Sequence, residues 1–331
     1  MTNQMAKPAY NAKRRIQYLF AFCVFLIVAA TAAWYFVAGK IDEGAGNAIA
    51  AQGAKGLDIE CPNRDVRGYP FRFGLFCDAL SFTDRKSAIS FRAGGVRSAA
   101  QFYDPTKIVA ELDGPAILNL ADGQMINLSW SLMRATSVIA LGEPLPDSFS
   151  LVGKQFTLST NDITLRADQI ETHMRVVGTD VDVAGRAEAI VFETSMLGVN
   201  QLPPLGVDFN TRLKDAATKI RSENFNPRGL SGVLSRAAVL LNTDSGLLID
   251  GPFAVDDAGL IDAALTLRII DVDAVTRVVT QSFPQIAPIF TAFTAGQPRS
   301  GEKSDEINLE ITIAKSNVSL GFIPLGRIPQ L

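Results

Sequence analysis

The sequence predicts an α+β protein that is mainly β, in which antiparallel curved sheets and a few packing helices follow one transmembrane helix. Three observations support this fold class. An apolar run without any charge lies close to the start of the chain. After it, many segments alternate apolar and polar residues with a period of two, which is typical of strands with one buried face. Pairs such as Asp-Gly and Asn-Asp, which favour turns, separate these segments.

Length and composition indicate a folded protein with a sizeable core. The chain has 331 residues, of which 47% are apolar and 20% are charged, whereas a disordered chain is poorer in apolar residues. The net charge is −3, although several basic residues stand at the very start of the chain. The remainder is therefore more acidic than the total, and such a surface does not favour nucleic acid as a partner.

The apolar run extends from Ile16 to Gly39 and predicts a transmembrane helix. At 1.5 Å per residue it is longer than the hydrocarbon core of a bilayer, which is about 30 Å thick. Basic residues precede the run, and Asp42 and Glu43 follow it. Residues 1–15 should therefore stay in the cytoplasm while the rest of the chain crosses. The aromatic residues Trp34 to Phe36 fit a belt at the far interface.

A cleaved signal peptide is the alternative interpretation of the same run. Ala30-Thr31-Ala32 offers small residues of the kind that mark a cleavage site. The apolar residues continue through Val37, beyond the usual length of a signal-peptide core, and this favours an uncleaved anchor. Under either interpretation the rest is exported. Residues 40–56 then form a Gly- and Ala-rich stalk or continue the helix, and residues 57–331 form the β-rich domain.

The cysteines predict a disulfide in the exported part. Cys23 lies inside the apolar run, whereas Cys61 and Cys77 follow it. A bridge is chemically permitted outside the cytoplasm, and closing a loop of this length would stabilise the fold by about 3 kcal/mol in the chain-entropy model. The alternative is two buried free thiols. Two isolated cysteines and a single distant histidine do not make a zinc site.

Strands are expected over most of the exported chain. Ile117 to Leu120 faces Met125 to Trp130 across an Asp-Gly pair, which predicts a hairpin. Ile170 to Val176 alternates apolar and polar residues as a strand with one buried and one wet face does. Closing strands are expected near Asn308 to Ile313 and Val318 to Ile323. This pattern indicates an antiparallel meander.

Two segments have helical character. Residues 203–241 carry helix-forming residues and apolar positions spaced by three or four, which predicts two packed helices. Residues 273–295 predict a helix with Asp273 as a candidate cap. Pro284 and Pro288 should kink or divide that helix, because proline removes a backbone hydrogen bond.

The search for catalytic groups yields little. The only histidine, His173, alternates with Glu171 and Arg175, which predicts a solvent-facing position on a strand. No P-loop, dinucleotide fingerprint or zincin motif is present. We therefore expect no enzyme activity, no cofactor and no metal. The remaining enzymatic hypothesis is a hydrolase that uses His173 as its base.

The most distinctive segment lies between the two exported cysteines. Gly68 and Pro70 break the chain before Phe71, which starts an alternation of aromatic and polar residues. One interpretation is a disulfide-closed turn with an aromatic core face. The other is a small basic patch beside the membrane, formed by Arg64, Arg67 and Arg72.

At Gly68-Tyr69-Pro70-Phe71-Arg72-Phe73 the sequence resembles the alphaproteobacterial envelope family catalogued as domain of unknown function 2125. The N-terminal span, the paired cysteines and the closing segment Gly321 to Pro329 also carry this resemblance. It implies a single-pass inner-membrane protein with a periplasmic domain, and it implies no catalytic residue. Leu248 to Ile269 has a weaker similarity to AsmA-like envelope proteins, which are implicated in lipid traffic and form a hydrophobic groove.

We therefore expect a non-enzymatic protein, anchored in the bilayer, that binds or transfers an apolar ligand such as a lipid. The ligand would lie between a curved sheet and the helix at 273–295. The alternative is a structural or scaffold subunit that contacts another envelope protein. Its contact would use an exposed sheet edge or the helices expected at 203–241.

Overall fold

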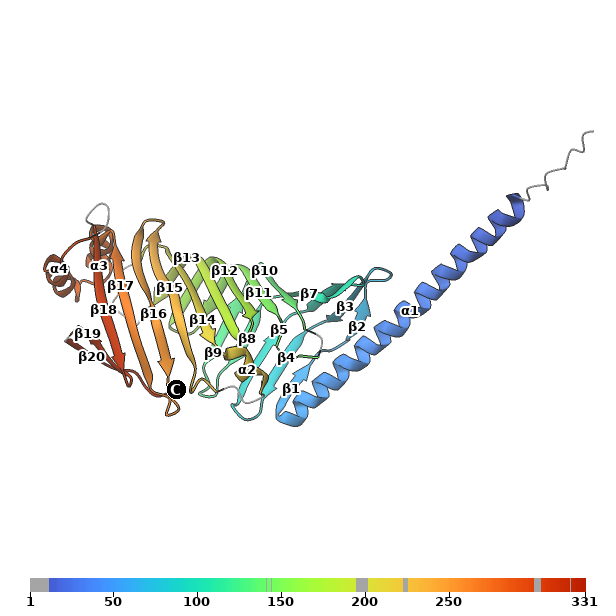
Figure 1. Ribbon diagram of the computed structural model, residues 1–331, viewed down its shortest axis with the longest axis horizontal. Helices are drawn as coiled ribbons and strands as arrows, with labels where there is room; N and C mark the ends of the chain where they lie inside the picture. Colours follow the sequence, from blue (N-terminus) through green and yellow to red (C-terminus); the bar gives the residue numbers. More distant parts are fainter. Residues whose placement is uncertain are drawn as a thin grey trace, which may run out of the picture.

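Twenty antiparallel strands form one continuous sheet in the computed structural model, and four helices flank it within the residues that it describes. The described residues are 12–140, 142–143, 145–194, 202–222, 226–300, 305–321 and 323–331. The helix α1 projects from one end of the elongated molecule, and α3 and α4 lie at the other end (Figure 1). The helices are α1 Ala12–Lys55, α2 Ala216–Arg221, α3 Val272–Ser282 and α4 Ala287–Ala295. The strands are β1 Leu57–Glu60, β2 Asp65–Arg67, β3 Arg72–Cys77, β4 Leu80–Asp84, β5 Ile89–Ala93, β6 Val96–Gln101, β7 Asp104–Leu112, β8 Ala116–Asn119, β9 Met125–Ser129, β10 Leu132–Val138, β11 Ser148–Ser159, β12 Ile163–Val177, β13 Asp180–Thr194, β14 Leu205–Lys214, β15 Ser231–Asn242, β16 Ser245–Val255, β17 Ile261–Ile270, β18 Glu306–Ala314, β19 Asn317–Leu320 and β20 Ile323–Arg327.

The predicted span and the predicted stalk form one uninterrupted helix. α1 is long and apolar enough to cross a membrane, and its most apolar part makes almost no contact with the rest of the protein. The side chains between Ile16 and Ala30 are exposed. Trp34 and Ala38, each 7% exposed, are the first buried positions along the helix. The N-terminal half of α1 is therefore bare, whereas its C-terminal half is docked on the sheet.

The prediction of two packed helices at residues 203–241 is wrong. The described part of the segment forms β14, the short helix α2 and β15. Bulges explain the error, because the register shifts between Leu234 and Ala237 where β15 meets β16. A bulge inserts an extra residue, so apolar positions on one face become spaced by three and imitate a helix. Pairing with the neighbouring strands then decides the structure, since helix propensity is a weak local preference.

The helix expected at 273–295 is present as two helices. α3 ends at Ser282 and α4 begins at Ala287, so the chain is divided around Pro284 as the prolines predict. The capping residue is Asp271 instead of Asp273, because its carboxylate accepts a hydrogen bond from the Ala274 amide at 3.0 Å. These helices cover the last strands. They bury a cluster that includes Ile269, Val272, Val275, Ile307 and Leu309.

The first ten strands form two leaves that meet along a line, which we call the crease. The first leaf contains β2, β3, β6, β7 and β10, and the second contains β1, β4, β5, β8 and β9. The strand β11 joins both, pairing with β10 through Ser148–Lys154 and with β9 through Thr157–Ser159. The chain thus crosses from one leaf to the other several times, each time through a short break between two strands. The breaks fall at residues 61–64, 78–79, 94–95, 113–115 and 130–131.

Small side chains and backbone hydrogen bonds hold the crease together. Cys77, Ala93 and Ala116 are buried there, at 7%, 5% and 1% exposure. Gly94 donates to the Asp113 carbonyl at 3.0 Å, and a side chain on Gly94 would meet that same carbonyl oxygen. The sheet can therefore bend here because the residues at the breaks are small.

The two faces of the sheet differ in the charge that they carry. Strand register places one uncharged row of cross-strand neighbours across the molecule. Its members are Ala110, Ala135, Leu151, Thr172, Gly185, Phe209, Ala237, Ile249, Leu267 and Leu309. The opposite face carries cross-strand ion pairs, such as Arg134 with Glu111 at 2.6 Å and Arg236 with Asp208 at 2.6 Å. We call the uncharged side the apolar face.

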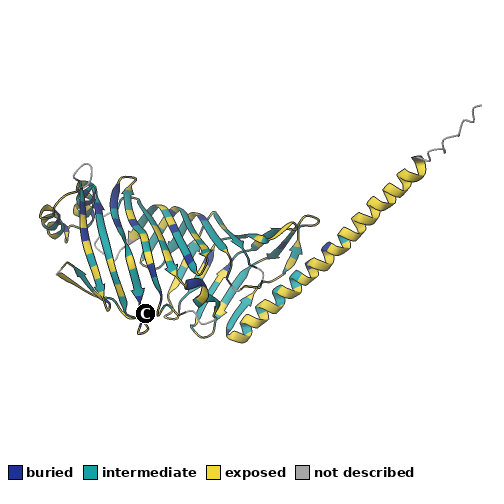
Figure 2. Cartoon of the chain, in the orientation of Figure 1, coloured by how far each residue is buried: buried dark blue, intermediate teal, exposed yellow. Residues whose placement is uncertain are grey.

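Much of the apolar face has no covering layer. The accessible surface of the chain is 20999 Å², whereas a compact monomer of this mass exposes about 13,000 Å². The bare helix accounts for part of the excess. Along the sheet most side chains are only half-buried, as the predominance of that class in Figure 2 shows. The apolar face is therefore available to a ligand or to a bilayer.

A glycine on the apolar face tests this register. A Cβ added to Gly185 would lie 2.3 Å from Cε1 of Phe209, the residue opposite it on β14. Gly185→Ala should lower the free energy of unfolding by about 1–3 kcal/mol, the usual cost of overpacking. In a Phe209→Ala background the same change should cost much less, because the ring is gone. Urea unfolding of the four proteins measures the coupling, and equal effects in both backgrounds would contradict the assigned register.

Candidate apolar pocket between the N-terminal helix and the first leaf

Trp34 fixes α1 against the first leaf. Its ring stacks on Phe73 with centroids 5.4 Å apart and an interplanar angle of 11°, and it meets Tyr69 edge-on at 5.6 Å. The indole Nε1 donates a hydrogen bond to the Arg72 carbonyl at 3.0 Å. A buried tryptophan normally needs such a partner for its N–H. One side chain thus joins the helix to the start of β3 by both packing and hydrogen bonding.

Polar contacts continue the docking toward the end of the helix. The hydroxyls of Thr31 and Tyr69 lie 2.7 Å apart, near the level of Trp34. Further along, Arg64 Nε donates to Asp42 Oδ1 at 2.6 Å, and this hydrogen bond lowers the pKa of the Asp42 carboxyl below its ordinary value. Near the helix end, Arg85 donates to the Gly53 carbonyl at 2.6 Å. The helix therefore lies along the free edge that β1 and β2 form.

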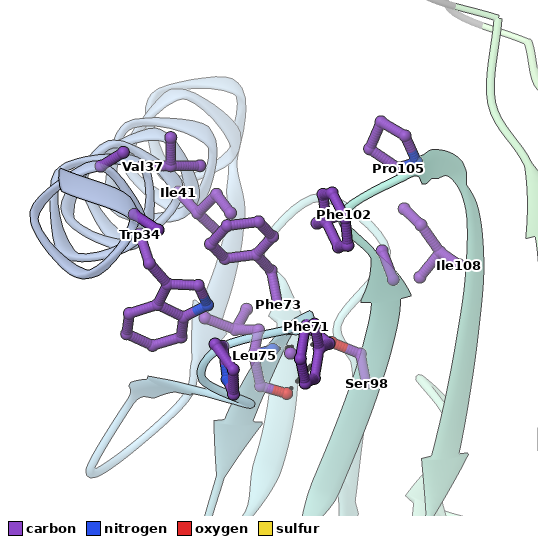
Figure 3. Close-up of a pocket in the computed structure, with 15 residues that line it drawn as sticks. Trp34, Val37, Ile41, Phe71, Phe73, Leu75, Ser98, Phe102, Pro105 and Ile108 are labelled. Carbon is purple, nitrogen blue, oxygen red and sulfur yellow. Dashed lines mark hydrogen bonds between the residues drawn. The ribbon is translucent and has the colours of Figure 1, made fainter. Parts of the chain in front are cut away.

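A cavity of about 930 Å³ lies between α1 and the first leaf (Figure 3). The helix contributes one stripe, and β3, β6 and the start of β7 contribute the opposite wall. None of the described residues that line it is charged. The Ser98 hydroxyl is already engaged, because it accepts from the Leu75 amide at 2.8 Å and donates to the Leu75 carbonyl at 3.1 Å. The lining residues are Ala30, Ala33, Trp34, Val37, Ile41, Pro70, Phe71, Phe73, Gly74, Leu75, Ser98, Ala100, Phe102, Pro105 and Ile108.

This pocket is one end of the apolar face. Phe73, Ala100 and Ile108 are cross-strand neighbours in the register, and they lie in a row beside the uncharged row described above. At this end α1 covers the face, in the middle α2 covers part of it, and at the other end α3 and α4 cover it. Between the two ends the face carries no charge along the row from Ala110 to Leu309. Chemically, such a surface can hold a hydrocarbon chain but offers nothing to orient a polar substrate.

The predicted disulfide is present. Cys61 and Cys77 are bonded, with their Cα atoms 5.2 Å apart, so the free-thiol alternative is wrong. The bridge joins the break after β1 to the end of β3, so it links the two leaves at the crease. Cys23 is a free, exposed thiol within the apolar part of α1.

The signature segment divides between a turn, an exposed tip and the pocket. Gly68 has a φ of 120°, and a Cβ there would lie 2.7 Å from the Arg72 carbonyl oxygen, so the turn requires glycine. The turn is closed by the Arg72 amide, which donates to the Gly68 carbonyl at 2.9 Å. The alternation that starts at Phe71 does lead into a strand, but Phe71 itself is not part of its packed aromatic face. β3 begins at Arg72, and Phe71 is 66% exposed, whereas Phe73 packs on Trp34.

The basic patch suggested by three arginines is not formed as such. Arg64 is paired with Asp42, and Arg67 is paired with Asp65 at 2.8 Å. Arg72 alone has no acidic partner within ion-pair distance in the part of the chain that the structure describes. Sequence reasoning also missed the helical half of the pocket. Its signal is the helical spacing of Ala30, Ala33, Val37 and Ile41.

His173 lies on the polar face, with Ser150 and Glu171 as neighbours. Its Nδ1 is 2.9 Å from the Ser150 hydroxyl, and its Nε2 is 3.4 Å from a Glu171 oxygen. These residue types occur in hydrolase triads, but the side chain of His173 is 47% exposed on an open sheet surface. The neighbouring strands β11, β12 and β13 are paired throughout this region. The amides of these described strands are therefore engaged in the ladder, whereas an oxyanion site needs backbone donors that are free.

Comparison with known proteins gives one informative result. A comparison with curated proteins found no match. A family model described as an uncharacterised protein conserved in bacteria, DUF2125, matches residues 34–329. The match begins at Trp34, the residue that docks the helix, and it extends over almost the whole sheet. The chain therefore belongs to the DUF2125 family.

Proposed function

We propose that this protein is a non-enzymatic inner-membrane protein that binds the acyl chain of a membrane lipid in the pocket beside α1. Ile16–Gly39 spans the bilayer once, residues 1–15 stay in the cytoplasm, and the sheet lies in the periplasm. The basic residues before the span and the acidic residues after it support this orientation. The disulfide supports an oxidising compartment for the sheet.

The observation that carries the proposal is the composition and size of the pocket. A volume of about 930 Å³ falls within the range of about 300–1,000 Å³ that is common for small-molecule sites. Ligand sites for polar molecules place a few polar groups on an apolar wall. Among the described lining residues only Ser98 and the Trp34 indole carry a polar group, and both groups are bonded within the protein. A hydrocarbon chain is the ligand that such walls favour.

The position of the pocket on α1 supports a ligand that comes from the bilayer. From Ile16 to Trp34 the helix rises about 27 Å, close to the thickness of the hydrocarbon core of about 30 Å. Ala30, Ala33 and Trp34 therefore line the pocket at the far boundary of the hydrocarbon. An acyl chain that enters exchanges one apolar environment for another, so the gain in free energy is small. Reversible exchange suits transfer better than storage.

A filled pocket tests this function. Ala100→Phe adds a ring to the pocket wall, and Ala99→Phe is the matched control because Ala99 is the preceding residue of β6 and faces the opposite side. The full chain, purified in a mild detergent, is examined by native mass spectrometry for retained lipid. We expect lipid on the wild type and on Ala99→Phe, and several-fold less on Ala100→Phe. Absence of lipid from the wild type, or equal retention by all three, would contradict the proposal.

A structural role in an envelope complex is the second candidate function. It is favoured by β20, whose five residues are all exposed and which pairs only with β19 in the described sheet. An exposed edge offers unpaired backbone groups to a strand of another protein. A photo-crosslinker at Leu325, which is 58% exposed, should then give one dominant protein product in intact cells. Only scattered, weak products there would argue against this role.

A further inference from the structure

Two hairpin tips of the first leaf carry a cluster of exposed aromatic residues. Tyr69 and Phe71 belong to the β2–β3 hairpin, and Phe102 and Tyr103 belong to the β6–β7 hairpin. Their exposed fractions are 47%, 66%, 56% and 71%. The tips touch, because Phe71 and Phe102 have ring centroids 6.4 Å apart and the Phe102 amide donates to the Phe71 carbonyl at 3.1 Å. We call these four residues the aromatic tips.

Water is an unfavourable environment for such a cluster. A contiguous exposed apolar patch marks a site of interaction with another protein or with a membrane. Aromatic side chains with a polar end, such as Tyr69 and Tyr103, are enriched where a bilayer meets water. The four residues sit on two adjacent tips and not on a broad flat surface. This shape suits shallow insertion into a bilayer.

The contacts with α1 place the aromatic tips at the level of the membrane boundary. The Tyr69 hydroxyl lies 2.7 Å from that of Thr31, and the Tyr69 ring meets Trp34. Thr31 and Trp34 are about 22 and 27 Å along the helix from Ile16, where the far side of the hydrocarbon core is expected. In Figure 1 the β2–β3 and β6–β7 ends of the first leaf lie toward the N-terminal half of α1. The tips and the helix therefore approach the same surface.

Neighbouring charges fit the same placement. Arg72 follows Phe71 and has no acidic partner among the described residues, so its guanidinium is available to lipid phosphates. Asp104 follows Tyr103, and its carboxylate accepts a hydrogen bond from the Thr106 hydroxyl at 3.1 Å. That bond directs the carboxylate toward the base of the hairpin. The four tip residues themselves are uncharged.

We propose that the aromatic tips insert into the periplasmic leaflet beside α1 and form a second membrane contact of the domain. This inference rests on the membrane span proposed above but not on any ligand in the pocket. A single helix lets the domain rotate, whereas two contacts fix its orientation. Because Phe71 and Phe102 also line the pocket, the insertion places this part of the pocket wall against the lipid.

Site-directed nitroxide labels in lipid nanodiscs test the insertion. The natural Cys23 reports on the span, and Phe102→Cys in a Cys23→Ser background reports on the aromatic tips. Lys86→Cys in the same background is the control. Lys86 lies on the exposed β4–β5 turn beside Gly56, at the far end of α1 and about 30 Å along the helix axis from Trp34. Collision rates with oxygen and with a water-soluble nickel complex give the depth of each label.

We expect the oxygen-to-nickel ratio at position 102 to exceed that at position 86 by several-fold, with position 23 higher still. A label at Tyr103→Cys should agree with position 102, so one disturbed side chain does not decide the result. If position 23 is deep but positions 102 and 103 match position 86, the tips lie in water and the inference is overturned. If position 23 is also accessible to nickel, the span itself is wrong.

Discussion

Replacing Cys61 and Cys77 together with alanine should lower the free energy of unfolding by about 3 kcal/mol, the value expected for a bridged loop of this length. The bridge joins Cys61, which directly follows the edge strand β1, to Cys77 at the end of β3. Urea unfolding followed by tryptophan fluorescence measures the change. Trp130 is a suitable reporter, because its Nε1 donates to the Leu112 carbonyl at the crease at 2.8 Å.

Cys23→Ser is the matched control for this result. It removes the third cysteine, which is free and lies in the apolar part of α1, so the unfolding midpoint should not change. Reduction of the wild type should reproduce the shift of the double variant. Identical midpoints for the double variant and the wild type would mean that the crease does not depend on the bridge.

Trp34→Ala should undock the C-terminal half of α1. The ring stacking on Phe73 and the hydrogen bond to the Arg72 carbonyl are each worth about 1 kcal/mol. Docking should therefore weaken by about 2 kcal/mol, which is about a thirtyfold change in the equilibrium. The helical structure of residues 40–55 depends on docking, because this segment contains Gly44, Gly46 and Gly53, and glycine weakens an isolated helix. Amide hydrogen exchange of that segment should accelerate accordingly.

Phe36→Ala is the control for the docking prediction. Phe36 is an aromatic residue two positions further along the helix and is 69% exposed, so its loss should leave the exchange unchanged. If Trp34→Ala also leaves residues 40–55 protected, the remaining contacts, such as Arg64 with Asp42, hold the helix by themselves. The pocket would then keep its wall, and the variant should still retain lipid.

The accuracy of the sequence predictions follows the range of the interactions that decide each feature. The membrane-length helix, the hairpin at Asp122-Gly123 and the strand through His173 depend on neighbours along the chain, and each is present. The division of the 273–295 helix depends on Pro284 and Pro288 and is present as well. The orientation of the span depends on the membrane and stays a prediction.

The failures occur where distant strands decide. Residues 203–241 form strands because β13 and β16 pair with them, and bulges obscure their period. The crease is invisible locally, since Gly94-Gly95 and Gly114-Pro115 look like ordinary turns. Only the register shows that they lie on one line. The cap of α3 is Asp271, two positions before the predicted Asp273, for a similar reason. The strand β17 extends to Ile270 and sets where α3 begins.

By itself the sequence determined that this protein has, among the described residues, one helix long and apolar enough for a membrane, a β-rich remainder, and the signature of the DUF2125 family. These features are written in composition and in short spacings. Only the tertiary structure decided that Cys61 and Cys77 are bonded, that Trp34 and Phe73 meet, and that a pocket lies between α1 and the first leaf beside a charge-free face. The physical reason is that a pocket belongs to no single segment. It forms where α1 and β3 pack together, and strand pairing across the sheet fixes that arrangement.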